Sequence, residues 1–129
     1  MYNGDMRRQP VQSHRELIIW QRAIQLCVAV YEVTRSFPRD EIYGLTNQLR
    51  RASVSIPSNI AEGYGRLSRE QYRHFLGIAQ GSNLELQTQL VIAKELGYAA
   101  ESAAGKVEAV SYEVGKMLTA LLKKLQPMP

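Results

Sequence analysis

The sequence predicts an all-α protein that folds as an up-down-up-down antiparallel four-helix bundle. Apolar residues recur every three or four positions along most of the 129 residues, which is the period of an amphipathic helix. No segment shows the alternation of a half-buried strand, and the sequence contains no internal repeat. The breaks between the periodic segments are short, so consecutive helices are expected to be antiparallel neighbours.

The first two helices are delimited by signals at their ends. The first is expected over about residues 16–36, because a residue that precedes proline, here Pro38, avoids the helical region. Asp40 is the expected N-cap of the second helix, since its short side chain can accept a hydrogen bond from the first turn. This helix is expected to reach about Tyr64, where two glycines allow the chain to turn.

The third and fourth helices complete the predicted bundle. Ser68 and Gln71 form a capping-box pattern at the start of the third helix, which is expected to end near Gly97. The fourth helix is expected over about residues 101–125, before Pro127. The predicted organisation is a flexible N-terminal tail at 1–14, the four-helix bundle at 15–126 and a C-terminal tail at 127–129.

The composition is typical of a soluble globular protein and argues against several classes of site. The hydrophobic fraction is 45%, the charged fraction is 22%, and no apolar run approaches the roughly 20 residues of a membrane helix. The first residues lack the apolar segment of a secretion signal, and Cys27 is the only cysteine, so a cytoplasmic location is expected. With one cysteine and two histidines we expect no metal site, and no motif indicates a cofactor. The arginines are spread over three segments and form no basic amphipathic membrane helix, so we expect no membrane partner.

The excess positive charge comes from arginine in the first part of the chain. Residues 1–75 hold 11 arginines, no lysine and 7 acidic residues, whereas residues 76–129 hold 5 lysines, no arginine and 5 acidic residues. Arginine makes bidentate contacts with phosphates and carboxylates. The asymmetry indicates a phosphate-binding surface, although a solvated surface of uneven composition explains a net charge of +4 equally well.

Each predicted helix carries an apolar stripe that suits the core of a bundle. In the first helix we assign to the core the stripe that contains Cys27, which makes this cysteine a small core residue and not a nucleophile. The members of this stripe are Leu17, Trp20, Ile24, Cys27, Tyr31 and Thr34.

The first and third helices carry a second apolar stripe. A monomeric bundle leaves the outer side of each helix polar, so a helix that is apolar on two sides is expected to contact another subunit. Scattered apolar surface residues are the alternative. The second stripe consists of Ile19, Ala23, Leu26, Val30 and Val33 in the first helix, and of Gly77, Gly81, Leu84, Thr88, Val91 and Ile92 in the third. We assign the five residues of the first helix, with Gly77, Gly81 and Leu84, to an oligomer interface.

The segment SVSIPSNIAEGYGR, residues 53–66, places a proline among small polar residues inside the second helix. Pro57 has no N–H, so it frees the carbonyl of Ser53 and is expected to bend the helix, with Ser53 or Ser55 bonding to the freed backbone. The polar groups either satisfy this bend or form a contact surface for another helix, subunit or ligand. Those along one edge of the helix are Arg51, Ser55, Ser58, Asn59, Glu62 and Arg66.

The sequence from about Leu17 to Leu125 strongly resembles a known bacterial family. The segments that carry the resemblance are FPRDEIYGLTNQLRRASVSIPSNIAEGYGR, FLGIAQGSNLELQTQL and ELGY. They are similar to the four-helix bundle family encoded in intervening sequences of bacterial large-subunit ribosomal RNA genes, which includes the accessory protein of diversity-generating retroelements. The polar members of this signature are Ser55, Asn59, Glu62, Ser82 and Glu85.

The resemblance implies a ring-shaped homo-oligomer, expected to be a pentamer, which agrees with the second apolar stripes. It also implies a non-enzymatic protein that binds RNA or DNA and assists a reverse transcriptase or another nucleic-acid enzyme. The residues expected to bind nucleic acid are the arginines on the second helix and around the turn that follows it: Arg50, Arg51, Arg66, Arg69 and Arg73.

A scaffold that binds only protein is the first alternative function. In that case Arg50, Arg51 and Arg66 pair with Glu62 and Glu85 within or between subunits, which leaves no free basic surface.

A metal-independent ribonuclease of the HEPN class is the second alternative. Arg69 and His74 fit the R-x-x-x-x-H motif of that class, in which the arginine stabilises a phosphate and the histidine moves a proton. Residues five apart point about 140° apart on a regular helix, which weighs against this interpretation.

Overall fold

The computed structural model describes residues 13–127, and within them the protein is all-α, with no strand. Four α-helices follow one another, and a short 3-10 turn precedes each of the first two. The elements are η2 (His14–Glu16), α1 (Ile18–Thr34), η3 (Arg39–Glu41), α2 (Leu45–Tyr64), α3 (Arg69–Glu95) and α4 (Glu101–Lys124).

The predicted helices are all present, with ends that differ by a few residues from the expected ones. Of the predicted tails, residues 1–12 and 128–129 lie outside the described residues. The described part of the N-terminal tail is folded, because the hydroxyl of Ser13 accepts a hydrogen bond from the backbone N–H of Arg15 at 3.0 Å and caps η2.

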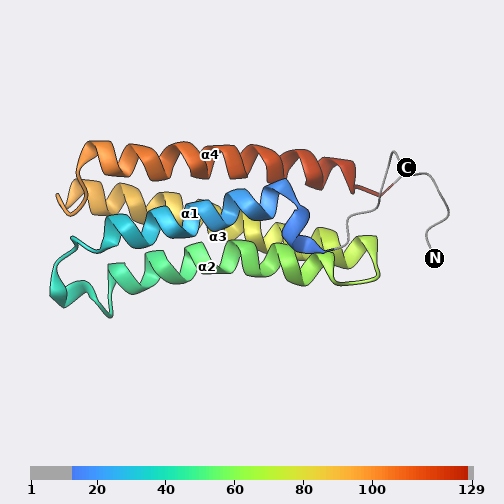
Figure 1. Cartoon of the computed structure of the whole chain (residues 1–129), viewed down its shortest axis with the longest axis horizontal. Coiled ribbons are helices and arrows are strands. Elements are labelled where there is room, and N and C mark those ends of the chain that lie inside the picture. The colour runs from blue at the N-terminus through green and yellow to red at the C-terminus, as the bar shows by residue number, and fades with distance from the viewer. Residues whose placement is uncertain (1–12, 128–129) are drawn as a thin grey trace.

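The four helices lie side by side (Figure 1). α1 packs against α2 and α4, and α3 packs against the same two helices, with the most extensive contact between α2 and α3. The α1–α2 and α3–α4 connections lie at one end of the molecule, and the α2–α3 turn lies at the other. Every helix therefore has two neighbours and buries one face between them.

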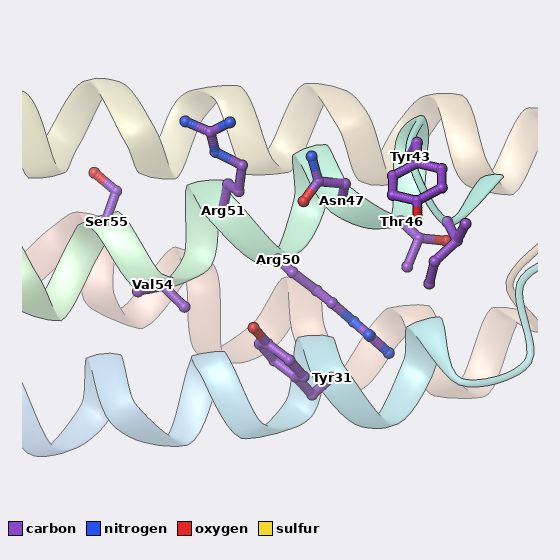
Figure 2. A pocket seen from close by; sticks show the side chains of 9 residues that line it. Tyr31, Tyr43, Thr46, Asn47, Arg50, Arg51, Val54 and Ser55 are labelled. Atoms are coloured by element: carbon purple, nitrogen blue, oxygen red, sulfur yellow. The ribbon is translucent and has the colours of Figure 1, made fainter.

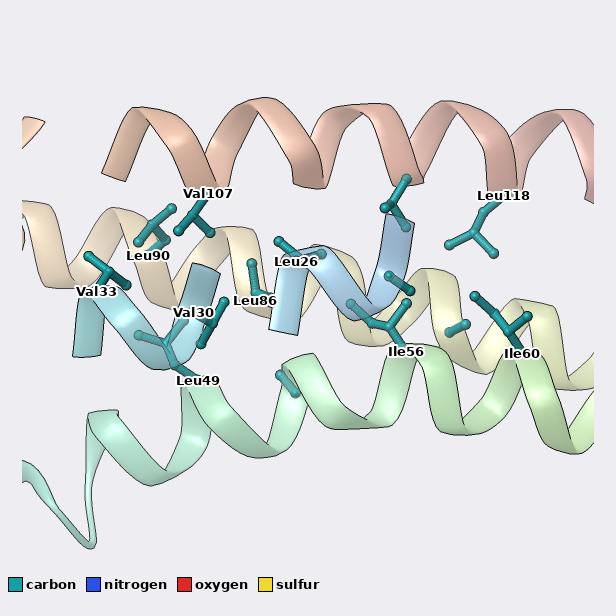
Figure 3. Packing of buried hydrophobic residues seen from close by; sticks show 14 of the residues in the cluster. Leu26, Val30, Val33, Leu49, Ile56, Ile60, Leu86, Leu90, Val107 and Leu118 are labelled. Atoms are coloured by element: carbon teal, nitrogen blue, oxygen red, sulfur yellow. The ribbon is translucent and has the colours of Figure 1, made fainter. Parts of the chain in front are cut away.

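The core stripe of α1 differs from the predicted one. Ala23, Leu26 and Val30 are fully buried, and with Ile19 and Val33 they belong to the core shared with the other helices (Figure 3). Their assignment to an oligomer interface is therefore wrong, because the chain's own core covers them. The two stripes of α1 are offset by one residue, which is 100° on a helix, and both are apolar, so the pattern alone does not choose between them.

The stripe of α1 that was expected in the core lies at the edge of its buried face. Tyr31 is exposed, Trp20 and Cys27 are half-buried, and only Thr34 is buried. Tryptophan and tyrosine combine a large apolar ring with a polar tip, so a partly solvent-exposed position suits them better than the centre of the bundle. The aliphatic stripe fills the centre instead.

The N-cap of α2 is Gly44 and not Asp40, and the side chain of Glu41 serves the first N–H of the helix. The Asp40 prediction is wrong because residues 39–41 form the separate turn η3, and the helix begins at Leu45. The carboxylate of Glu41 accepts hydrogen bonds from the Leu45 N–H and from the Tyr98 hydroxyl, each at 2.9 Å. These two donors hold the pKa of the Glu41 carboxyl below its usual range. A Cβ at Gly44 would lie 2.5 Å from a carboxylate oxygen of Glu41, so glycine gives this cap its room.

The ends of α3 agree with the prediction. The Ser68 hydroxyl accepts a hydrogen bond from the Gln71 N–H at 3.2 Å, so Ser68 is the N-cap. At the other end Gly97 has a φ of 75°, and the Tyr98 N–H donates to the Ala93 carbonyl at 2.9 Å. This is a Schellman motif, in which a left-handed glycine ends the helix and turns the chain toward α4.

The carbonyl freed by Pro57 finds its partner on another helix. α2 continues as a helix through Pro57, and the thiol of Cys27 in α1 donates to the Ser53 carbonyl at 2.9 Å. Burial raises the pKa of the Cys27 thiol, so it keeps the proton that it donates. The expected role of the serine side chains at this carbonyl is wrong: the Ser53 hydroxyl donates to the Arg50 carbonyl, and the Ser55 hydroxyl bonds to Ser82.

Gly63 allows α2 and α3 to approach closely near the turn that joins them. A Cβ at this position would lie 2.8 Å from the Cβ of Phe75 and 3.0 Å from Cδ1 of Tyr72. No ordinary side chain fits in that space. A Cβ at Gly105 of α4, by contrast, would meet no atom within 4 Å.

Replacing Gly63 by alanine should destabilise the protein. Overpacking costs about 1–3 kcal/mol and exceeds the gain of about 1 kcal/mol from the better helix former. The matched variant Gly105→Ala has open space, so it should stabilise the protein by up to about 1 kcal/mol. Urea unfolding at one protein concentration measures both, and a stabilising Gly63→Ala would contradict the close approach.

Removing the thiol of Cys27 should cost more when Pro57 is present than when it is absent. Cys27→Ala leaves the Ser53 carbonyl without its donor, at a cost of about 1 kcal/mol or more. In a Pro57→Ala background the new N–H of residue 57 can bond to that carbonyl within the helix, so the same change should cost about 1 kcal/mol less. A double-mutant cycle by urea unfolding measures the coupling, and equal costs in both backgrounds would show that the thiol does not serve this carbonyl.

Candidate functional site

A polar contact joins α2 to α3 in the middle of the bundle. The hydroxyls of Ser55 and Ser82 are hydrogen-bonded to each other at 2.8 Å. The side-chain amide of Asn59 donates to the Ser55 carbonyl at 2.8 Å and to its hydroxyl at 2.9 Å. Three polar side chains from two helices therefore form one network, which fixes how α2 and α3 are aligned.

This network lies at one end of an open groove of about 340 Å³ between the two helices, which we name the α2–α3 groove. Charged and amide side chains make up most of its walls. Among the described residues, no hydrogen bond or ion pair reaches the side chains of Arg51 or Glu85, although both line the groove. The lining residues are Asn47, Gln48, Arg51, Ala52, Ser55, Ser82, Glu85 and Gln89.

A second hollow, of about 600 Å³, adjoins the groove on the other side of α2 and reaches α1 (Figure 2). We name it the Tyr31–Tyr43 hollow. Arg50 extends from α2 toward Tyr31, whereas Arg51 and Asn47 extend toward the opposite side, where α3 lies. The lining residues are Tyr31, Ile42, Tyr43, Thr46, Asn47, Arg50, Arg51, Val54 and Ser55.

Arg50 is held in place without an acidic partner among residues 13–127. Its Nε donates to the hydroxyl of Thr34 at 2.8 Å, and its guanidinium lies 4.6 Å from the centre of the Tyr31 ring. The Thr34 hydroxyl in turn donates to the Val30 carbonyl at 2.8 Å. The guanidinium is therefore oriented by a hydroxyl and an aromatic face, and its positive charge is not neutralised by a carboxylate.

Two tyrosines flank these arginines. Tyr43 is 91% exposed, which is unusual for an aromatic side chain, and Tyr31 is exposed as well. An exposed aromatic ring next to an arginine offers a flat apolar face and a positive charge to the same ligand.

The other three predicted arginines lie near the opposite end of α2, and two of them, Arg66 and Arg69, are engaged in contacts. Arg66 pairs with Glu62 at 2.6 Å and lies over the Phe75 ring. Arg69 donates to the Lys124 carbonyl at 2.7 Å, whereas the Nε of Arg73 is buried and has no hydrogen-bond partner among the described residues. About 15 residues of helix, or roughly 22 Å, separate Arg51 from Arg66. The five arginines therefore form two groups and not one cluster.

Arg69 and His74 contact different neighbours. The guanidinium of Arg69 is hydrogen-bonded to the end of α4, and the ring of His74 lies edge-on to Phe75 at a centroid distance of 5.3 Å. Among the described residues, no group of histidine, cysteine and acidic side chains could hold a metal ion.

The second stripe of α3 lies on the outside of the bundle. Leu84 is 57% exposed, Val91 52% and Ile92 45%. A Cβ added at Gly77 or Gly81 would meet no atom within 4 Å. Within residues 13–127, this apolar face is thus uncovered, whereas the second stripe of α1 is buried. No helix among the described residues is long and apolar enough to cross a membrane.

A profile of the 23S rRNA-intervening sequence protein family matches residues 15–120, which is most of the chain. The chain belongs to this family. The resemblance inferred from the sequence is therefore confirmed. Four of the five signature residues of this family member also meet in the structure: Ser55, Asn59 and Ser82 form the hydrogen-bonded network, and Glu85 lines the groove beside it. The fifth, Glu62, pairs with Arg66.

A solved structure shares the fold of this family member. It is the crystal structure of a protein with unknown function from the S23 ribosomal protein family of Bacteroides thetaiotaomicron. The TM-score is 0.74 at 20% sequence identity, and the match covers 82% of this chain and 99% of the other. At this identity the similarity shows the fold alone. A search of the curated proteins finds no match.

Several residues of these two hollows were not singled out from the sequence of this family member. Asn47 precedes Arg51 and Ser55 at the four-residue spacing of one helix face, so the periodicity of α2 could have indicated it. Nothing in the sequence places Tyr31 beside Arg50, because that contact depends on the register between α1 and α2. Gln89 likewise depends on the register between α2 and α3.

Proposed function

We propose that the protein binds single-stranded RNA or DNA without catalysing a reaction, at the surface formed by the Tyr31–Tyr43 hollow and Arg51. The observation that carries the proposal is a pair of arginines, Arg50 half-buried and Arg51 exposed, that have no acidic partner among residues 13–127 and line a hollow together with two exposed tyrosines. Arginines bind phosphates, and aromatic rings stack on unpaired bases.

The chemistry of this surface suits a single strand better than a duplex. Stacking on tyrosine requires a base that is not already paired and stacked, and each such contact contributes about 1–3 kcal/mol. Arg50 is already oriented by Thr34 and Tyr31, so little side-chain freedom is lost when it binds a phosphate. Binding of this kind tolerates many sequences and weakens as salt is added.

The opposite end of α2 is a weaker candidate. Arg66 would have to leave Glu62, and Arg69 would have to leave the Lys124 carbonyl, before either could bind a phosphate. Because the guanidinium of Arg69 is bonded to the Lys124 carbonyl, the structure gives no support to a HEPN-like ribonuclease in which Arg69 acts together with His74. A non-catalytic role is therefore our proposal.

We further propose that the helices form an up-down-up-down bundle and that the bundles assemble into a ring of identical subunits, with a pentamer as the expected number. The uncovered apolar stripe of α3 supports assembly, because an exposed contiguous apolar face is typical of an interface. A ring would repeat the arginine–tyrosine surface, so several weak contacts would act together. In the cytoplasm, a reverse transcriptase or another nucleic-acid enzyme would be a suitable partner.

Charge reversal at Arg51 should weaken RNA binding. We expect the wild-type protein to bind a labelled mixed-sequence RNA in fluorescence anisotropy at low salt, with affinity that falls steeply as salt rises. Arg51→Glu should weaken binding about tenfold, since it removes an attraction and adds a repulsion. The control Lys106→Glu makes the same change in charge on α4 and should have a much smaller effect.

Arg66 and Arg69, which the sequence also predicted to bind nucleic acid, provide a further comparison of RNA affinity. Arg66→Glu combined with Arg69→Glu should weaken binding less than Arg51→Glu alone, because both arginines are already engaged. No binding at tens of micromolar wild-type protein would favour a scaffold that binds only protein. Equal losses for all these variants would show that only net charge matters.

Charge on the outer stripe of α3 should dissociate the assembly. Leu84→Glu combined with Val91→Glu places two charges in the proposed interface, where burial without partners is costly. Both positions are exposed within the chain, so the bundle should still fold. Light scattering should show an oligomer for the wild type and for the control Val28→Glu on α1, and a monomer for the double variant. A wild-type monomer at micromolar concentration would contradict the proposed assembly.

A further inference from the structure

The α2–α3 groove contains a buried acceptor that has no partner. Gln89 is only 6% exposed and lines the groove, and its Oε1 atom has no hydrogen bond among the described residues. A buried carbonyl oxygen without a donor destabilises the folded protein. The atom itself has almost no accessible surface, so Gln89 contributes a polar wall to the groove, and any ligand is bound by the more accessible groups beside it.

The Ser55–Ser82 hydrogen bond sets the order of the groups along the groove. One helical turn from this bond, α2 contributes Arg51 and α3 contributes Glu85. One further turn along, Gln48 and Gln89 line the walls. Arg51 and Glu85 make no ion pair with each other. The guanidinium of Arg51, a donor, and the carboxylate of Glu85, an acceptor, are therefore both available to a ligand in the groove.

The opposite charges of these two groups restrict the class of ligand. Glu85 disfavours a phosphate in the groove, and Arg51 disfavours a cationic side chain. A neutral planar group that carries donors and acceptors side by side satisfies both residues. The edge of a nucleobase has this pattern. The volume, about 340 Å³, is at the small end of ligand sites, which span roughly 300–1,000 Å³.

We propose that the α2–α3 groove binds an unpaired guanine base. This inference rests on the proposed nucleic-acid binding and names the base that the same surface prefers. Guanine carries two adjacent donors, N1–H and the 2-amino group, which match the two oxygens of the Glu85 carboxylate. Its O6 and N7 atoms accept hydrogen bonds from arginine, here Arg51.

The other bases fit these groups less well. Adenine and cytosine each offer only their exocyclic amine as a donor, and uracil offers a single N–H between two carbonyl oxygens that repel a carboxylate. A bidentate match between a side chain and the correct base favours that base about fivefold to 150-fold in affinity. A strand that lies across the Tyr31–Tyr43 hollow would therefore place a guanine in the adjoining groove.

Titration with nucleoside monophosphates tests this assignment apart from strand binding. All monophosphates carry the same phosphate, so differences report the base. By NMR chemical-shift titration of the full chain, we expect GMP to bind about tenfold more tightly than AMP, and IMP, which lacks the 2-amino group, to fall between them. Glu85→Gln should reduce GMP affinity to the AMP level, because an amide presents a donor where guanine needs an acceptor. Equal affinity for GMP and AMP would overturn the assignment.

A matched variant separates the effect of Glu85 from that of charge. Glu95→Gln makes the same chemical change on an exposed position of α3 outside the groove and should leave the preference for GMP intact. An equal loss in both variants would overturn the role of Glu85. If mixed-sequence RNA binds but GMP and AMP do not differ, the guanine assignment fails while the proposed function stands.

Discussion

The close packing of α2 on α3 is the constraint on which the candidate site depends. Gly63 lets the two helices meet near their turn, because a Cβ there would lie 2.8 Å from the Cβ of Phe75. Further along, the Ser55–Ser82 hydrogen bond fixes their register. Once that register is set, Arg51 of α2 and Glu85 of α3 are brought to the same groove without being paired to each other. The polar groove is thus a consequence of helix packing.

α1 is tied to α2 through two contacts that also prepare the site. The thiol of Cys27 serves the carbonyl that Pro57 frees, and Thr34 orients the guanidinium of Arg50. The proline that breaks the hydrogen-bond ladder of α2 therefore becomes a point of attachment between helices. The guanidinium of Arg50 contacts a hydroxyl and a tyrosine ring. Because it contacts no carboxylate among residues 13–127, its positive charge is not neutralised.

The sequence predicted the parts of this architecture that depend on local chemistry. The four helices follow from apolar periodicity, the start of α3 from Ser68, and its end from Gly97. The phase of α1 could not be predicted, because its two apolar stripes differ by one residue and only packing shows that Leu26 is inside. For the same reason the sequence grouped all five arginines, whereas contacts with Glu62 and with the end of α4 engage two of them.

The measurement that tests the central claim most directly is photocrosslinking of a 4-thiouridine-labelled single-stranded RNA to the full chain, with the crosslinked residues identified by mass spectrometry. Tyrosines occur at both ends of α2, so the method can report either surface. Our account predicts crosslinks at Tyr31 and Tyr43, which flank the free arginines. Crosslinks confined to Tyr64 and Tyr72, near the α2–α3 turn, would contradict it.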